Sequence, residues 1–150
     1  MSARIPLPAH AEPVEVWAGR ALRFAGYAAL FGRRDAGRDT IRPGAFARSL
    51  AHRAEPIPLL WQHRPALPIG WVELACEDAR GLRVIAALAN PESAPARALR
   101  QGAVSGLSFG YRARAFQRDR QGRELIDIDL FEISLVTLPM QHAARVHLIV

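Results

Sequence analysis

The chain has 150 residues, of which 50% are hydrophobic, and its 20 basic against 14 acidic side chains leave a formal net charge of +6. Every basic residue is an arginine, which excludes a Schiff base, a Ser-Lys dyad and a lysine-dependent phosphate loop, while the single cysteine, Cys76, excludes an internal disulfide, a CxxC redox pair and a cysteine-based zinc cluster. The hydrophobic content is too high for a disordered chain, and no apolar run approaches the roughly 20 residues of a membrane span, so we expect a folded protein with no membrane partner.

The chain is predicted to be one domain over residues 14–150, preceded by a flexible N-terminal arm at residues 1–13 that contains prolines and has no hydrophobic period. Those prolines interrupt the apolar stretch that a secretory signal needs, so we expect no such signal. With only one cysteine in the chain, we expect a reducing, cytoplasmic location.

The first half of the domain alternates apolar segments with breaks at Gly, Pro and Asp. Pro43 suits a first helical turn, and Phe46 and Leu50 share one helical face, so this segment predicts a helix. In chain order we expect two strand pieces in 14–31, a polar loop at 31–40, a helix at 43–53, a short buried strand at 57–63 and a hairpin at 68–89 with its tip at 77–81.

Strands dominate the second half. A short helix in 90–102 is expected, with Ser93 as its cap, Leu99 as its apolar anchor and Gly102 just after its end. Then follow a long strand at 103–117, a turn at 119–122, one or two strands at 123–139 and a last strand at 145–150. Because regular βαβ alternation is missing, the predicted fold class is α+β: a small, strand-dominated antiparallel β-barrel flanked by helices.

The arginines are scattered from Arg4 to Arg145 without a run. This distribution is typical of a GC-rich coding sequence and argues against a nucleic-acid partner, although a basic protein can bind nucleic acid or an acidic protein. Arg112 and Arg114 are the pair of arginines that concentrates positive charge near a candidate site.

Only six serines are available as nucleophiles, and Ser108 is favoured among them. Period-2 alternation puts Leu107 and Phe109 on the core face of the long strand and Ser108 on the other face, between Gly106 and Gly110. We expect the two glycines to leave its hydroxyl uncovered, so that a substrate backbone can approach. The alternative is that the glycines mark bulges or barrel corners and that Ser108 is simply solvated.

The residues GLSFG also match the Gly-x-Ser-x-Gly pattern of the α/β-hydrolase nucleophile elbow. That motif needs a strand, a sharp turn and a helix, whereas the sequence here continues to alternate as a strand. We therefore reject this context.

A serine nucleophile needs a base and a group that orients it. His63 ends a buried strand directly before a loop, so it is favoured over the other histidines, with a structural histidine as the alternative. Glu132 interrupts the apolar segment FEISLVTLP and therefore needs a partner, either a histidine or an arginine. No histidine pair has nearby carboxylates at metal-ligand spacing, so we expect no metal and no other cofactor.

Two further acids, Asp127 and Asp129, alternate with apolar residues and are read as the solvated face of a strand. They leave one other catalytic order open, in which Ser108 works with one of these aspartates and with His142.

Five blocks in this order, GYAALFG, IRPGAF-x-RSL, PLLWQH followed by PIG, GLSFGY and FEISLVTLP, resemble the prohead (capsid maturation) proteases of tailed bacteriophages. That family is distantly similar in fold to the herpesvirus assemblin proteases. The resemblance runs from about Gly26 to Arg145 and implies a serine endopeptidase built on a small β-barrel. It carries the catalytic roles to His63, Ser108 and Glu132, the same three residues that their positions favour.

The resemblance also implies the biological setting. The substrates would be a scaffolding protein or the N-terminal segment of a major capsid protein, and the protease itself, inside an assembling procapsid where its copies associate. The source would be a phage, a prophage or a gene-transfer agent. A catalytically silent structural or scaffold component of such a particle is the alternative.

Two departures from the family pattern are visible. The segment after Glu132 reads PMQHAAR where the family usually has Pro-Ala-Asn-Pro, and a serine, Ser105, stands where many members have an acid. By the resemblance, Arg145 is the nearest match to the arginine-bearing segment that serves the oxyanion, and we assign it, with Gly106 and Gly110, to oxyanion or substrate binding.

Overall fold

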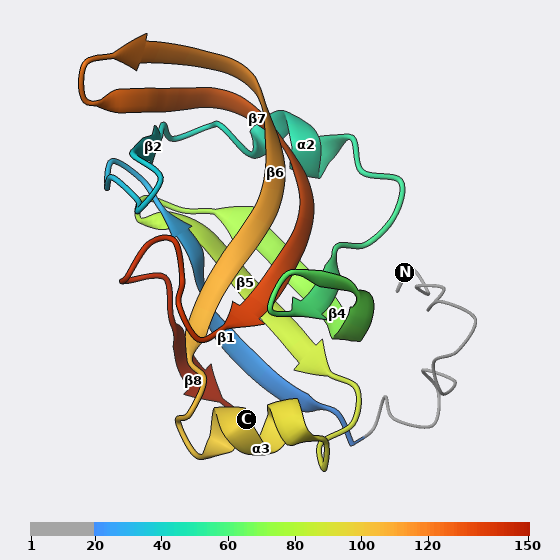
Figure 1. Ribbon diagram of the computed structural model, residues 1–150. Coiled ribbons are helices and arrows are strands. Elements are labelled where there is room, and N and C mark those ends of the chain that lie inside the picture. Colours follow the sequence, from blue (N-terminus) through green and yellow to red (C-terminus); the bar gives the residue numbers. More distant parts are fainter. Residues whose placement is uncertain (1–19) are drawn as a thin grey trace.

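The computed structural model describes residues 20–150, so the arm predicted at residues 1–13 lies outside the described residues. The described part contains eight strands and two helices (Figure 1). In chain order they are β1 (Leu22–Leu30), β2 (Asp39–Ile41), α2 (Ala47–Ala51), β3 (Pro58–Trp61), β4 (Arg64–Glu77), β5 (Gly81–Leu88), α3 (Ala94–Arg100), β6 (Gly106–Asp119), β7 (Gly122–Val136) and β8 (Val146–Ile149). None of the helices in this range is long and apolar enough to cross a membrane.

The strands form one curled sheet in the order β2-β7-β3-β4-β5-β1-β8, with β6 paired to β7. Its two sides meet where the start of β6 joins the segment that leads into β8. There the Leu107 N–H donates to the Ala144 carbonyl and the Val146 N–H donates to the Ser105 carbonyl. The expected strand-dominated fold is thus confirmed as a curled half-barrel, in which the β2–β7 and β3–β7 pairs are parallel and the others antiparallel.

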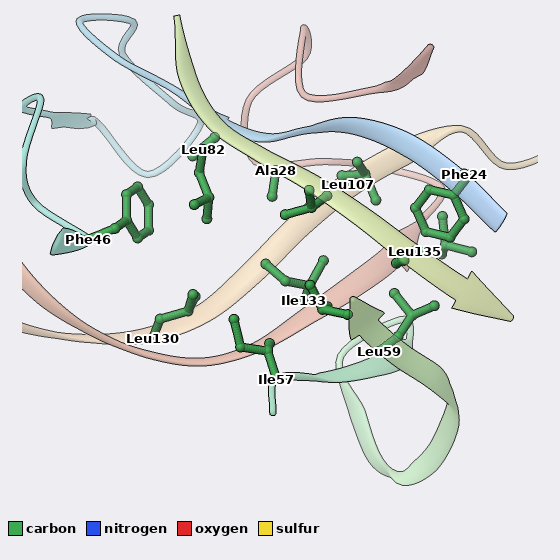
Figure 2. Packing of buried hydrophobic residues seen from close by; sticks show 14 of the residues in the cluster. Phe24, Ala28, Phe46, Ile57, Leu59, Leu82, Leu107, Leu130, Ile133 and Leu135 are labelled. Atoms are coloured by element: carbon green, nitrogen blue, oxygen red, sulfur yellow. The ribbon is translucent and has the colours of Figure 1, made fainter. Parts of the chain in front are cut away.

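The inner face of the sheet is filled by apolar side chains from strands that are far apart in the sequence (Figure 2). Leu107 of β6, Leu59 of β3, and Ile133 and Leu135 of β7 are all fully buried. Burial of such a side chain stabilises the fold by about 1.5–3 kcal/mol, so this layer fixes how β3, β6 and β7 lie against one another.

The first helix is shorter than the sequence predicts. It was expected over 43–53, but α2 covers only Ala47–Ala51. Gly44 has a φ of +94°, a left-handed conformation that cannot continue a right-handed helix. Its N–H and that of Phe46 donate to the Glu77 carboxylate across the molecule, which replaces the first helical turn.

The second helix is confirmed in detail. The Ser93 hydroxyl accepts from the Ala96 N–H at 3.2 Å, Leu99 is buried, and Gly102 has a φ of +75° just beyond the helix end.

The predicted strands are confirmed with two differences. Two strand pieces were expected in 14–31, but the described residues of this segment form one strand, β1, which continues through Gly26. The tip of the hairpin between β4 and β5 lies as expected, and the segment 123–139 forms a single strand, β7, that begins at Gly122 and ends at Val136. However, the end of the supposed loop at 31–40 enters β2, a short strand parallel to β7. The buried Asp39 explains why: its carboxylate accepts from both Arg123 and Tyr111, so a polar residue belongs to the sheet here.

Candidate active site

His63 lies in a tight turn between β3 and β4, where Trp61 pairs with Arg64. Gln62 and His63, the two turn residues, have φ values of +52° and +59°. A two-residue hairpin turn of this kind requires left-handed backbone at both positions, which most side chains disfavour. The Gln62 N–H donates to the Leu135 carbonyl at 2.9 Å, so the turn is fastened to β7.

The His63 ring faces Glu132. Its Nδ1 lies 2.5 Å from Oε1 of Glu132, and the side chain of Glu132 is only 12% exposed against 41% for that of His63. The hydrogen bond to Glu132 raises the pKa of His63 above its ordinary value, against the smaller opposing effect of burial. The predicted histidine partner for Glu132 is therefore present in the structure.

Glu132 does not lie in the core, although its strand is strongly apolar. Gly110 pairs with Glu132 and Tyr111 with Leu130, so Phe131 is an extra residue on β7, a β-bulge. Beyond the bulge, Ile133 faces the core, and Glu132 lies on the opposite face, beneath the turn that carries His63.

A second serine, Ser134, contacts both His63 and Glu132. The hydroxyl of Ser134 donates to Oε2 of Glu132 at 2.6 Å and accepts from the backbone N–H of His63 at 3.1 Å. Ser134 is completely buried. Sequence reasoning did not select it; the available signal was its position two residues after Glu132, which puts both side chains on one face of a strand.

Ser108 lies directly opposite Ser134 in the β6–β7 ladder, so it shares their face. The predicted faces of β6 are confirmed, because Leu107 is fully buried in the core. The expectation that the Ser108 hydroxyl is uncovered is wrong in degree, because the residue is only 3% exposed. Among residues 20–150, the Ser108 side chain makes no hydrogen bond, and neither does Nε2 of His63.

The two glycines beside Ser108 have close neighbours. A Cβ on Gly110 would lie 2.6 Å from Oε1 of Glu132, and one on Gly106 would lie 2.6 Å from the Val136 carbonyl oxygen and 2.8 Å from Pro139. A side chain at position 106 would therefore meet backbone, whereas one at position 110 would displace the side chain of Glu132. Gly110 makes room for the acid, and Gly106 for the loop after β7.

Arg145 is held at the start of β6. Its backbone forms a bridge with Gly106, and its guanidinium donates to the His142 carbonyl at 2.8 Å and to the Ser105 hydroxyl at 3.1 Å. Ser105 is half-buried, and its hydroxyl lies against this arginine. The buried Gln141 side chain accepts from the Leu30 N–H and donates to the Leu30 carbonyl, which ties the loop to β1.

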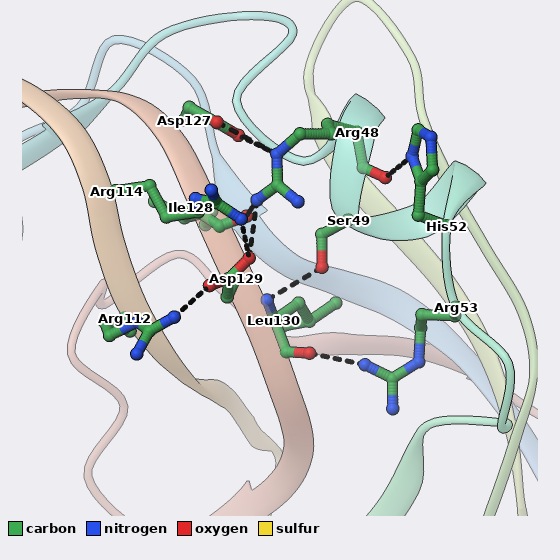
Figure 3. Close-up of polar contacts among 10 residues, drawn as sticks. All are labelled: Arg48, Ser49, His52, Arg53, Arg112, Arg114, Asp127, Ile128, Asp129 and Leu130. Atoms are coloured by element: carbon green, nitrogen blue, oxygen red, sulfur yellow. Dashed lines mark hydrogen bonds and ion pairs between the residues drawn. The ribbon is translucent and has the colours of Figure 1, made fainter.

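The other candidate acids lie in a separate cluster on the outer side of β7 (Figure 3). Arg48 of α2 pairs with Asp127 at 3.0 Å and with Asp129 at 2.5 Å, and Arg112 and Arg114 also pair with Asp129. The expectation of a merely solvated face is therefore wrong, because α2 packs over this part of the strand.

His142 belongs to neither cluster. It lies beside the Arg145 guanidinium, which is 3.3 Å from its Nδ1, and no contact with Asp127 or Asp129 is found among residues 20–150. The alternative order of Ser108, one of these aspartates and His142 is thus not brought together. Within the same residues, no group of three or more His, Cys, Asp or Glu side chains could hold a metal ion.

The family described as caudovirus prohead serine protease matches residues 11–150. The prohead protease of Enterobacteria phage HK97 is 32% identical over 130 residues, covering 82% of this chain and 58% of that protein. The capsid polyprotein of Pseudomonas phage PAJU2 is 32% identical over 103 residues, covering 61% of this chain and 15% of that protein. The chain thus spans less than two thirds of these relatives.

Two herpesvirus enzymes share the fold. The KSHV protease, solved in complex with a hexapeptide phosphonate inhibitor, has a TM-score of 0.61 at 16% identity, covering 85% of this chain and 64% of that one. The varicella-zoster virus protease has a TM-score of 0.58 at 18% identity, with the same coverage of 85% and 64%.

Proposed function

Since the chain belongs to the caudovirus prohead serine protease family, we propose that it is a serine endopeptidase of capsid maturation, with Ser108 as nucleophile, His63 as base and Glu132 as the acid that orients it. The observation that carries this proposal is the 2.5 Å contact between Nδ1 of His63 and Glu132, on the face of the β6–β7 ladder that also holds Ser108. That contact leaves Nε2 as the nitrogen available to the nucleophile.

The geometry supports acyl transfer through an acyl-enzyme. Oγ of Ser108 attacks the scissile carbonyl carbon, and its proton passes to Nε2 of His63. Glu132 accepts the hydrogen bond from Nδ1–H and stabilises the imidazolium that forms. The tetrahedral intermediate collapses as His63 gives the proton to the leaving amine. Water then attacks the ester by the same path, which restores the Ser108 hydroxyl and releases the acid product.

The substrate would approach along β6. The Leu107 N–H of β6 donates to the Ala144 carbonyl, and after this residue β6 pairs only with β7 among the described strands. The other backbone edge of β6 is therefore available to an extended peptide. Gly106 and Gly110 flank Ser108 on β6, and Arg145 bridges to Gly106; these three are the proposed oxyanion and substrate-binding residues. The bridge between Gly106 and Arg145 brings the arginine segment to the start of the nucleophile strand.

The names of the relatives, a prohead protease and a capsid polyprotein, support a capsid protein or a scaffolding protein as substrate and partner. Self-cleavage and self-association inside the procapsid belong to the same proposal. Enclosure in a shell raises the effective concentration of enzyme and substrate, so a weak protease suffices there. The family assignment does not favour the alternative of a catalytically silent scaffold component.

The test is to coexpress this chain with the capsid protein that is encoded next to it. We expect the unaltered chain to shorten that protein, as seen by N-terminal sequencing, and Ser108→Ala to leave it at full length. Ser49→Ala is the matched control, because it also removes a buried hydroxyl near β7 but lies in the outer cluster. Processing that continues in Ser108→Ala would show that the assignment is wrong.

A further inference from the structure

We propose that Ser134 is a positioning residue that, together with the space left by Gly110, holds the Glu132 carboxylate in the orientation that aligns His63. The inference rests on the proposed function, because it concerns the same acid and base. It adds a residue outside the three proposed catalytic ones.

The Ser134 hydroxyl both donates and accepts a hydrogen bond. An ionised carboxylate only accepts, so the hydroxyl proton of Ser134 must point at Oε2 of Glu132, 2.6 Å away. Its lone pair then accepts the His63 N–H at 3.1 Å. One hydroxyl thus fixes the carboxylate plane and the backbone of the base at the same time.

Burial makes this arrangement firm. Ser134 is completely buried, so no water competes for its hydroxyl, and its polar contacts act in a less polar medium than water. The same burial, with the proton committed to Glu132, excludes Ser134 as a substitute nucleophile.

Gly110 defines the other side of the carboxylate. A Cβ at this position would lie 2.6 Å from Oε1 and 2.9 Å from Cγ of Glu132, closer than side chains approach one another. Oε1 is the oxygen that contacts His63, so any side chain at position 110 would displace it.

The turn gives an independent reason for the Ser134 contact. Gln62 and His63 both have left-handed φ values, and such backbone persists only where its surroundings hold it in place. The bond from the His63 N–H to Ser134 is one of the contacts that do so. Without it, a histidine in this conformation would lose the tie between its backbone and β7.

The first experiment measures His63 directly. In a Ser108→Ala background, which cannot cleave itself, NMR titration gives the pKa of His63 with and without Ser134→Ala. The Glu132 hydrogen bond raises this pKa, so a loosened carboxylate should let it fall towards the ordinary value. This readout is independent of whether the chain is a protease.

The second experiment uses the active chain and a peptide substrate. A hydrogen bond to a charged group corresponds to about 10- to 100-fold in rate, so Ser134→Ala should lower kcat by that factor while KM changes by less than about threefold. The acidic limb of the pH–rate profile should move to lower pH. Ser49→Ala, which loses a 2.9 Å bond from the Leu130 N–H, is the control for loss of a buried hydroxyl and should move neither kcat nor the limb.

Gly110→Ala provides a second variant if Ser134→Ala fails to fold. Its added Cβ meets the end of a flexible side chain rather than backbone, so the protein should fold while the carboxylate moves. We expect the same loss of kcat and the same shift of the limb. An unchanged His63 pKa and unchanged kinetics in either folded variant would overturn the inference, even if Ser108→Ala is inactive and the proposed function stands.

Discussion

Two sites on the same strand, β7, hold acidic side chains with different partners. In its middle, Asp127 and Asp129 pair with arginines of α2 and β6 (Figure 3). Near its end, Glu132 contacts a histidine and a buried serine. An arginine stays protonated at any physiological pH, so the first group is a permanent ion-pair network that joins α2 to the hairpin. A histidine can lose and regain its proton, so only the second group can do acid–base chemistry.

The two groups also differ in how they are covered. The Arg48 side chain is 35% exposed and that of Arg112 is 70% exposed, so solvent screens much of the outer network. Glu132 and Ser134 lie under the His63 turn and are buried or nearly so. On one strand, the partner and the cover of a carboxylate, and not the carboxylate itself, decide whether it joins an ion-pair network or contacts a histidine.

The largest expected effect is on activity, at Glu132. Glu132→Gln keeps the size of the side chain but no longer accepts correctly from Nδ1–H of His63, so kcat should fall by roughly 10³- to 10⁴-fold. Asp127→Asn, the same change in the outer group, should leave kcat unaltered. Peptide cleavage assays on both variants, with circular dichroism to verify folding, measure the difference. Equal losses in the two variants would remove the functional distinction between the groups.

The next expected effect is on pH dependence. In the proposed mechanism His63 must be neutral to accept the Ser108 proton, so activity should rise with pH through the pKa of His63. Glu132 raises this pKa from 6.5, so the midpoint of the acidic limb of kcat/KM should lie above that value. In Glu132→Gln, the residual activity should show a midpoint at lower pH. A limb that stays in place in that variant would mean that Glu132 does not act on His63.

The smallest expected effect is on stability, in the outer group. Arg48→Gln removes the ion pairs with Asp127 and Asp129, and exposed pairs contribute little, so the melting temperature should fall by about 3 °C or less. Added salt at about 1 M should shrink the difference between the variant and the unaltered chain, because it screens the pairs. Cleavage activity should be unchanged. Calorimetry at two salt concentrations tests this, and a loss that persists at high salt would point to packing of the Arg48 stem instead.

The alternation of apolar residues was enough to predict the long strands and the faces of β6, because a core excludes polar side chains from one face of a strand. It was not enough for β7 around Glu132. The bulge at Phe131 shifts the period by one residue, and no local signal shows it. For the same reason the sequence suggested that Glu132 interrupts a core strand, whereas it lies on the face opposite the core, beneath His63.

Helix ends and turns could likewise be predicted from the sequence in some segments and not in others. Ser93 and Gly102 bracket α3 as predicted, since capping depends on neighbouring residues only. The shortened α2 and the short strand β2 depend instead on Glu77 and Arg123, whose contacts with them cross the fold. Such long-range hydrogen bonds override local preference and leave no trace in the nearby sequence.

Composition and order thus determined the range of possible chemistry: with no lysine, one cysteine and six serines, few nucleophiles exist in this chain, and Ser108 stands out between two glycines. Only the tertiary structure decided which acid meets His63, because parallel pairing of β3 with β7 brings residues 69 positions apart into contact. It also decided the contacts of Ser134, whose hydroxyl lies between the left-handed turn and Glu132. The sequence specifies the type of each side chain, but the packing of distant strands determines which partner that side chain contacts.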